Sequence, residues 1–367
     1  MRAYLDHAST SPLRPAARDA MLQWLGAADP GRVHTEGRMA RFALEDARDA
    51  VAGLFGTRSR QVIFTSGATE AVNSATFGAL RARPGPVALA AVEHSAVREA
   101  CEQWAPGVLA LGVDGTGRIS VSAVAAAIDA GAGMVQCQLA NHEVGTIQPV
   151  AEIAGMCRER GVVLHIDAAA GAGHLPIDFD RLGADLLSVS AHKLGGPAGA
   201  GALLVRRGLR IPPFIVGGAQ ERARRGGLEN VAAAVGFGAA AAELTTCLAA
   251  EASVARARTD RLRAGLLAVP GVIDYGTASG LPNLVCVGIE GIEAEPVLIG
   301  LDRAGVAAHS GSSCSSESLE PSPVLEAMGV DGERSLRLSV GWSTTDAEVD
   351  LAIAAFPAVV EGLRRLR

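Results

Sequence analysis

The sequence is nearly devoid of lysine and poor in aromatic side chains. Among its 33 lysine and arginine residues only Lys193 is a lysine, and aromatic residues make up 4% of the chain. The formal net charge of −6 provides no electrostatic footprint for nucleic acid or an anionic membrane. No stretch approaches about 20 uninterrupted apolar residues, and residues 1–6 do not have the pattern of a signal peptide. We therefore expect a soluble, cytoplasmic protein with neither a nucleic-acid nor a membrane partner.

The cysteines lack the spacing of a metal site or a redox pair. Six are scattered along the chain without a CxxC pair, so neither a zinc site nor a disulfide framework is predicted. Five lie in apolar or helical settings and are expected to be small core residues: Cys101, Cys137, Cys157, Cys247 and Cys286. Cys314 lies instead among serine and glycine in residues 309–318, which predicts an exposed thiol in a mobile loop. Such a thiol is a candidate nucleophile, although an incidental surface cysteine would fit the same pattern.

The single lysine stands where a ligand could bind. The apolar strand expected at 186–191 leads to Lys193, beside a Gly-Gly-Pro turn, and open α/β sheets bind their ligands at the carboxyl ends of strands. Arginine can replace lysine in charge and hydrogen bonding, but it cannot deprotonate or condense with a carbonyl group. Lys193 is therefore a candidate for a Schiff base with an aldehyde cofactor. The alternative is a surface lysine that persisted by chance.

Apolar strands and helix-like segments alternate through the first part of the chain. Two helices are expected at about 12–25 and 38–55. Strands are then expected at 61–65, 86–92, 108–113, 134–140, 162–167, 186–191 and 201–206. Helices are expected between most of them, near 68–80, 95–104, 120–130 and 148–160. This alternation predicts an α/β large domain with a mainly parallel sheet flanked by helices.

The pattern changes after residue 230 and predicts a smaller α+β domain. An alanine-rich stretch at 230–266 indicates one or two helices that bridge to it. The elements expected next are strands at 282–288, 306–309 and 335–340, helices at 294–304 and 321–328, and a final helix. Thr345 and Glu348 have the spacing of a capping box for that last helix. We assign residues 13–250 to the large domain, and residues 1–12 and 251–367 to the small domain that carries Cys314.

Polar residues at expected strand ends are further candidates for a site. Residues 65–70 follow a strand and open a helix, so their N–H groups and the helix dipole could bind a phosphate or serve only as a cap. Asp167 ends a strand and could pair with a pyridinium nitrogen or cap a turn. The ring of His94 could stack on a cofactor, or His94 could be an ordinary loop histidine. Arg337, within an apolar strand, suits a carboxylate ligand or a structural ion pair.

Eight short motifs occur in one order along nearly the whole chain. They span residues 4–12, 65–70, 93–94, 141–145, 165–168, 190–193, 220–222 and 310–321. Together they resemble the cysteine desulfurases, which are pyridoxal-phosphate enzymes of fold type I related to the class V aminotransferases. The number and order of the motifs make the resemblance specific.

The resemblance implies pyridoxal 5'-phosphate as cofactor and a role for each matching residue. Lys193 would hold the cofactor and move protons at the substrate α-carbon, while Asp167 would pair with the pyridine nitrogen. His94 would stack on the ring and take part in proton transfer. Asn141 would contact the ring hydroxyl and the substrate, and Arg337 would bind the substrate carboxylate. The residues that would hold the phosphate are Ala68, Thr69, Ser190 and His192.

The resemblance also implies a reaction and partners. Cys314 would attack the sulfur of L-cysteine, leaving an enzyme persulfide and releasing L-alanine. The enzyme would be a homodimer that passes the sulfur to an acceptor protein, such as an iron–sulfur scaffold or a sulfurtransferase. One alternative is a selenocysteine or cystine C–S lyase of the same fold, in which Cys314 would be dispensable. Another is a non-catalytic relative that acts as a binding or scaffold protein.

Three positions depart from the pattern of that family. The family usually has glutamine at Ala170, near the ring hydroxyl, and asparagine at Asp29 in the early loop. It usually has threonine at Leu228, which reaches the phosphate of the neighbouring subunit. These departures bear on cofactor affinity and substrate preference more than on fold.

Overall fold

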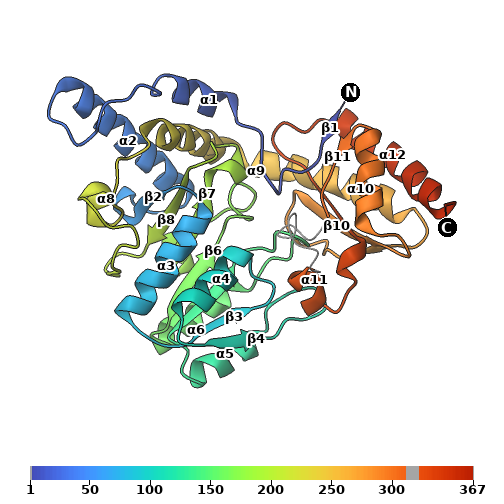
Figure 1. The fold of residues 1–367 in the computed structure, drawn as a ribbon, viewed down its shortest axis with the longest axis horizontal. Helices are drawn as coiled ribbons and strands as arrows, with labels where there is room; N and C mark the ends of the chain where they lie inside the picture. Colours follow the sequence, from blue (N-terminus) through green and yellow to red (C-terminus); the bar gives the residue numbers. More distant parts are fainter. Residues whose placement is uncertain (1, 311–321, 367) are drawn as a thin grey trace.

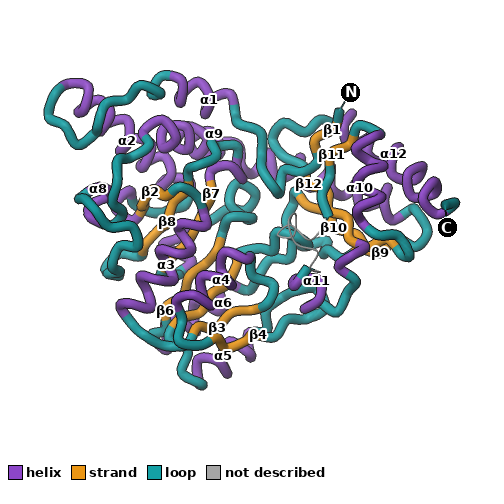
Figure 2. Tube along the Cα trace, viewed as in Figure 1, coloured by secondary structure: helices purple, strands orange, loops and turns teal. Residues whose placement is uncertain are grey.

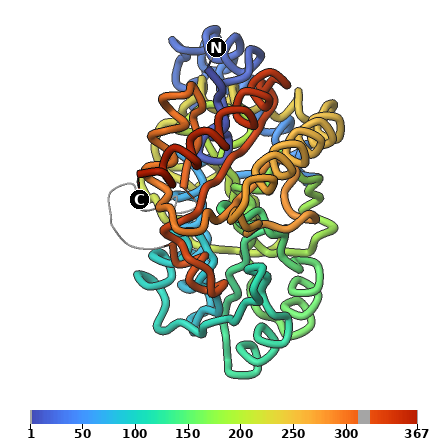
Figure 3. Tube along the Cα trace, turned by 90° about the vertical axis from the view of Figure 1, so that its right-hand side faces the viewer, coloured from blue at the N-terminus to red at the C-terminus, as the bar shows by residue number. Residues whose placement is uncertain are grey.

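A larger and a smaller α/β body lie beside each other in the computed structural model (Figure 1). The structure describes residues 2–310 and 322–366, so the candidate nucleophile Cys314 lies outside the described residues. Figure 2 shows strands at the centre of each body and helices around them, and Figure 3 looks onto the smaller body, with its last helix in front. The α/β fold class predicted from the alternating pattern is confirmed.

The centre of the larger body is a seven-stranded sheet in the order β2-β8-β7-β6-β5-β3-β4. Its strands are β2 (Val62–Thr65), β3 (Val87–Ala90), β4 (Val108–Leu111), β5 (Met134–Gln138), β6 (Val163–Asp167), β7 (Leu186–Ser190) and β8 (Gly201–Val205). Each lies within a predicted strand. Neighbouring strands are parallel, except that β8 is antiparallel to both β2 and β7. The sheet is therefore mainly parallel, as predicted.

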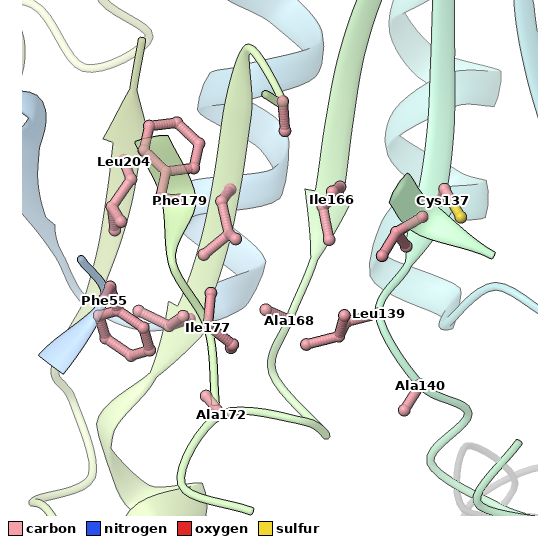
Figure 4. Packing of buried hydrophobic residues seen from close by; sticks show 14 of the residues in the cluster. Phe55, Cys137, Leu139, Ala140, Ile166, Ala168, Ala172, Ile177, Phe179 and Leu204 are labelled. Atoms are coloured by element: carbon pink, nitrogen blue, oxygen red, sulfur yellow. The ribbon is translucent and has the colours of Figure 1, made fainter. Parts of the chain in front are cut away.

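Helices cover both faces of this sheet. They are α1 (Pro15–Leu22), α2 (Thr35–Leu54), α3 (Ala68–Ala82), α4 (Ser95–Trp104), α5 (Val121–Asp129), α6 (Val150–Arg160), α7 (Phe179–Leu182) and α8 (Gln220–Ala223), with a 3-10 turn η1 (Ser59–Gln61). On one face, α3 and α4 pack with Val72 and Val97 against the sheet. On the other, a larger apolar core joins the sheet to α2, α5 and α6. Figure 4 shows part of this core, including Phe55, Ile166 and Phe179. Two layers of helices thus enclose the strands and leave their carboxyl ends accessible.

A single long helix, α9 (Val231–Leu267), connects the two bodies. Its buried residues up to Leu244 belong to the core of the large sheet, whereas those from Ala255 onward belong to the core of the smaller body. The domain boundary assigned at residue 250 lies between these two sets. The helix is long and apolar enough to cross a membrane, but more than half of its apolar stretch is buried inside the protein. It is a core helix.

The smaller body contains two short sheets. One pairs β1 (Ala3–Tyr4) in parallel with β11 (Val306–Ala307), and the other is antiparallel in the order β12-β10-β9. Its remaining elements are β9 (Val272–Asp274), β10 (Leu284–Ile289), β12 (Ser335–Ser339), α10 (Ala294–Arg303), α11 (Pro323–Ala327), α12 (Asp346–Arg364) and the 3-10 turn η3 (Gly332–Arg334). The capping box predicted from Thr345 and Glu348 is present at the start of α12. Strands β1 and β9 were not predicted, because they have only two and three residues.

The core placement predicted for five cysteines holds for four of them. The buried ones are Cys101, Cys137, Cys157 and Cys286. The prediction is wrong for Cys247, which is half-buried on α9 with its Sγ 3.2 Å from Glu251 Oε1. Arg14 binds both carboxylate oxygens of Glu251, at 2.9 and 2.6 Å, and Glu243 at 2.6 Å. One guanidinium thus binds both acids, and we interpret the group as an ion-pair cluster rather than a metal site.

Candidate active site

A cavity of about 430 Å³ lies at the carboxyl ends of β5, β6 and β7. This volume is in the range of small-molecule sites. Seven of the predicted site residues line it: Ala68, Thr69, His94, Asp167, Ser190, His192 and Lys193. The sheet register explains why they meet, because Asp167 pairs with Gln138 on β5 and with Ser188 on β7, the strand that leads directly to Lys193. The two strands that lead to Asp167 and Lys193, β6 and β7, are neighbours in the sheet.

Lys193 is held in a 3-10 turn, η2 (Ala191–Leu194), directly after β7. Its Nζ donates a hydrogen bond to the carbonyl of Ala8 in the N-terminal segment. The same segment donates from Ser11 N–H to the His192 carbonyl at 2.9 Å. Burial, with a smaller contribution from the charge of Lys193, lowers the pKa of His192 to about 4. His192 is therefore neutral at physiological pH and acts as a hydrogen-bonding group.

The carboxylate of Asp167 is nearly buried and fixed by two donors. Its Oδ1 accepts the backbone N–H of Ala169 at 3.0 Å and the hydroxyl of Ser188 at 3.1 Å. Behind it lies His165, whose pKa burial lowers to about 4. The imidazole of His165 is therefore neutral at physiological pH and adds no positive charge beside Asp167.

His94 has both a structural and a site position. Its Nδ1 accepts the N–H of Ala96 at 3.1 Å and caps α4. A nitrogen that accepts a hydrogen bond carries no proton, so a neutral His94 has its proton on Nε2. The ring meets the ring of His142 edge-on, with 5.0 Å between the centroids. Capping and cavity lining are thus combined in one side chain.

The start of α3 forms another wall of the cavity. Its N-cap residue is Gly67, and among residues 2–310 and 322–366 no side chain caps the first N–H groups of the helix, which can therefore bind an anion. Glu70, in the first turn, accepts from Ser66 N–H at 2.9 Å and from Arg225 at 3.0 and 3.2 Å. Burial opposes ionisation of Glu70, but these hydrogen bonds outweigh it and lower its pKa. The paired charge of Glu70 does not exclude an anion from the helix terminus.

Asn141 and Arg337 do not line the cavity. Asn141 is fully buried, and its Oδ1 accepts the N–H groups of Glu143 and Val144 at 2.8 and 2.9 Å while its Nδ2 donates to a backbone carbonyl. Arg337 is 1% exposed and donates to His142 O at 2.9 Å, Ser9 Oγ at 2.7 Å and Asp6 Oδ1 at 3.0 Å. The ion pair is the structural alternative that the sequence had left open.

Several residues of this region were not predicted from the sequence. Gln138 and His142 line the cavity, and Glu93 is completely buried behind it, accepting the N–H of Gln138 at 2.8 Å. Burial raises the pKa of Glu93 to about 8. One signal was available in the sequence. Polar residues alternate within the otherwise apolar strands β5 and β6, at Gln136, Gln138, His165 and Asp167, and strand geometry places them on one face of the sheet.

The three departing positions have different surroundings. Ala170 lines the main cavity. Leu228 is 63% exposed and lines a neighbouring cavity of about 210 Å³, which shares Ser66 and Gly199 with the first. Asp29 accepts a hydrogen bond from Gly31 N–H at 2.7 Å and pairs with Arg32.

The segment that leads to Leu228 contains an unusual backbone. Glu221, Arg222 and Ala223 have φ angles of 48°, 58° and 60°, in the left-handed region that L-residues rarely adopt. Two contacts of the Glu221 carboxylate hold this turn, because Arg48 donates to both of its oxygens, at 2.6 and 2.7 Å, and Phe64 N–H donates at 3.0 Å. Strained turns of this kind persist only where surrounding structure fixes them, and they cluster near functional sites.

Comparisons with known proteins agree with this architecture. A family model described as "Aminotransferase class-V" matches residues 3–351. A cysteine desulfurase of Trichormus azollae is 38% identical over 376 residues, which cover 99% of this chain and 94% of the relative. A NifS-like protein from Rickettsia africae ESF-5 has a TM-score of 0.89 at 28% identity, covering 98% of this chain and 100% of its own. A structure described as SspA in complex with cysteine has a TM-score of 0.83 at 28% identity, covering 94% and 100%. The chain therefore belongs to the aminotransferase class-V family and is a cysteine desulfurase-like, pyridoxal-phosphate-dependent enzyme.

Proposed function

We propose that this enzyme removes sulfur from L-cysteine, giving L-alanine and a persulfide on Cys314 for transfer to an acceptor protein. The observation that carries the proposal is the convergence of Lys193, Asp167 and His94 on one cavity of small-molecule size. The relative described in complex with cysteine supports the substrate. The acceptor would be an iron–sulfur scaffold or a sulfurtransferase, and the reaction would take place in the cytoplasm.

The residues present fit pyridoxal phosphate. When bound, this cofactor supplies an aldehyde and a ring that withdraws electrons from the substrate carbon. Lys193 provides the amine, and Asp167 a fixed carboxylate for the pyridine nitrogen. The uncapped start of α3, at Ala68 and Thr69, provides N–H groups for the phosphate. Ser190 and neutral His192 provide further hydrogen-bonding groups for it.

The chain's own residues would move protons and sulfur in turn. Lys193 would take the proton from the substrate α-carbon, and His94, with its proton on Nε2, would exchange a proton within the cavity. The thiolate of Cys314 would attack the substrate sulfur. The Cβ–S bond would then break with its electron pair left on Cβ. Protonation of Cβ, and return of a proton from Lys193 to the α-carbon, would give L-alanine.

The roles proposed for Asn141 and Arg337 need a rearrangement. The amide of Asn141 is used within its own turn, so it would reach the cofactor or the substrate only after giving up a contact. Arg337 already has Asp6 as an anionic partner. We propose that the substrate carboxylate replaces Asp6 at this guanidinium.

We propose a homodimer, because one side of the larger body exposes large apolar side chains. They are Leu22, Leu25, Val33, Met39, Phe42, Val216 and Leu228. The segments that carry them lie near one another, since Arg222 of α8 pairs with Glu45 of α2 at 2.7 Å (Figures 1 and 2). Exposed apolar patches of this kind mark association surfaces. Phe42→Asp should reduce the mass measured by sedimentation, and an unchanged mass would exclude this face.

One assay tests the proposed reaction against its alternatives. The enzyme, loaded with pyridoxal phosphate, is mixed with L-cysteine, and alanine, pyruvate and the persulfide on Cys314 are quantified. Alanine and persulfide in equal amounts in the first turnover support the desulfurase. Cys314→Ser should bind the cofactor but form neither alanine nor persulfide. Alanine from this variant at the wild-type rate would favour a C–S lyase, and no turnover by the wild type would favour a non-catalytic relative.

A further inference from the structure

The carboxylate of Glu143 binds the first described residue after segment 311–321. Ser322 is fully buried, and its Oγ donates to Glu143 Oε2 at 2.5 Å. Ser322 Oγ also accepts the N–H of Leu325 at 3.2 Å, so Ser322 caps α11. Leu325 and Val324 are buried in the core of the large sheet. The C-terminal stem of the segment is therefore attached to the larger body by one side-chain hydrogen bond and by apolar packing.

Glu143 also lies next to the wall of the cavity. Its Oε1 is 3.5 Å from Nε2 of His142, which lines the cavity and meets the ring of His94. Glu143 itself is 2% exposed and does not line the cavity. One buried carboxylate thus contacts both the stem and a ring at the site.

The other stem of the segment is attached to the same turn of the chain. His309 exchanges backbone hydrogen bonds with Arg337, at 3.2 and 2.7 Å. The guanidinium of Arg337 then donates to the carbonyl of His142 at 2.9 Å. The C-terminal stem is thus bound directly to Glu143, and the N-terminal stem is linked through Arg337 to the neighbouring residue His142.

Capping of α11 alone does not explain a carboxylate at this position. Ser322 supplies the cap by accepting from Leu325, and a cap of this kind needs no acid behind it. Burying a carboxylate is costly unless it is well bound. Here one oxygen accepts from Ser322 at the start of α11, and the other lies 3.5 Å from the ring of the preceding residue, His142, so the carboxylate ties the stem to that ring.

We propose that Glu143 is a positioning residue that fixes the C-terminal stem of segment 311–321 relative to the cavity and orients His142 against His94. The inference rests on the proposed function, because Cys314 belongs to that segment. Glu143 touches neither substrate nor cofactor. We expect Glu143 to affect how often the thiol of Cys314 and the substrate sulfur come into a geometry in which they can react. Reaction rates depend steeply on this geometry.

The test uses Glu143→Ala, Glu143→Gln and Ser322→Ala in the enzyme loaded with pyridoxal phosphate. Glu143→Ala should lower kcat for alanine release by about ten- to a hundredfold. KM for L-cysteine and the absorbance of the bound cofactor should stay unchanged. Glu143→Gln keeps an oxygen that accepts from Ser322, so it should restore most of kcat. Thr259→Val is the matched control, because it removes a buried hydroxyl on α9 that does not contact this turn.

Two further measurements separate positioning from general loss of structure. In a double-mutant cycle, Glu143→Ala with Ser322→Ala should be no slower than the slower single variant, because both remove the same contact. Hydrogen exchange of the peptide over residues 322–328, followed without substrate, should become faster in Glu143→Ala and stay unchanged in Thr259→Val.

Each outcome gives a decision. If the wild type makes no alanine, the proposed function fails, while the exchange measurement still tests the attachment of the stem. If the wild type is active and Glu143→Ala keeps its kcat, or if the two variants multiply in their effects, the role of Glu143 is refuted. If Glu143→Ala does not fold, Ser322→Ala alone must lower kcat without changing KM, and an unchanged kcat refutes the proposal.

Discussion

Removing the charge of Asp6 should lower KM for L-cysteine, if Arg337 binds the substrate carboxylate. Asp6 is the anion that now occupies Arg337, at 3.0 Å, and Ser9 bonds to both of them. A hydrogen bond to a charged group is worth roughly 1.5–3 kcal/mol. The side chain of Asp6 is 18% exposed, and solvent screening reduces its contribution to about 1 kcal/mol. Asp6→Asn should therefore lower KM by about three- to tenfold, because the neutral asparagine competes less strongly than Asp6 with the substrate carboxylate for Arg337.

Initial-rate kinetics with L-cysteine, together with urea unfolding, distinguishes this role from a purely structural ion pair. A structural pair predicts a lower free energy of unfolding and an unchanged KM for Asp6→Asn. Ser9→Ala is the control, because it removes the 2.7 Å hydrogen bond to Arg337 without changing the charge. A KM that stays constant or rises in Asp6→Asn would refute the exchange of Asp6 for the substrate.

Four more predictions follow from single features of the structure. Lys193→Arg should keep the charge but abolish covalent attachment of the cofactor, and mass spectrometry after borohydride reduction should find no fixed adduct. Ala223→Gly should raise the free energy of unfolding by up to about 1 kcal/mol, because it relieves a left-handed residue; Ala219→Gly, at φ −96°, should lower it. Leu228→Thr should tighten cofactor binding about tenfold by equilibrium dialysis, and an unchanged constant would mean that residue 228 does not reach a phosphate. Burial lowers the pKa of four histidines to about 4: His7, His165, His174 and His192. Between about pH 6.5 and about 4 the unfolded chain binds protons at these histidines that the folded chain does not. The free energy of unfolding measured in urea should therefore decrease as the pH is lowered through this range. Glu93, with a pKa raised to about 8, binds a proton in the folded chain between about pH 8 and 4.5, which increases the free energy of unfolding as the pH is lowered. A free energy of unfolding that still increases toward pH 4 would mean that the histidines are not buried and neutral.

The sequence predicted the large sheet and most of the cavity because both depend on local patterns. Each strand of the sheet is a short apolar block, and Asp167 and Lys193 follow two such blocks directly. In a parallel sheet the carboxyl ends of strands meet at one edge, so adjacency in space followed from position in the chain. The same reasoning could have included Gln138, which ends β5 in register with Asp167.

Contacts between distant parts of the chain could not be read from these patterns. Arg337 and Asp6 are 331 residues apart, and nothing in an apolar strand specifies which acid its arginine meets. The pairing of β1 with β11 involves only two residues on each side. Cys247 failed for a different reason. Glu243 and Glu251 lie four residues to either side of it on the same helix, and the sequence did not show that Arg14, from a distant part of the chain, pairs with both of them on this side of α9.

The N-terminal segment joins the two halves of the proposed chemistry. Its residue Asp6 binds Arg337, and two residues later the carbonyl of Ala8 accepts from Nζ of Lys193. A carbonyl acceptor stabilises the protonated amine, whereas reaction with an aldehyde requires the unprotonated one. If Lys193 holds the cofactor as proposed, we expect its Nζ to give up the hydrogen bond to Ala8 when it condenses with the aldehyde. Because Asp6 and Ala8 share one short stretch of backbone, we expect a shift that frees the amine to move the anion paired with Arg337 as well, which would couple the proposed cofactor and carboxylate sites through this segment.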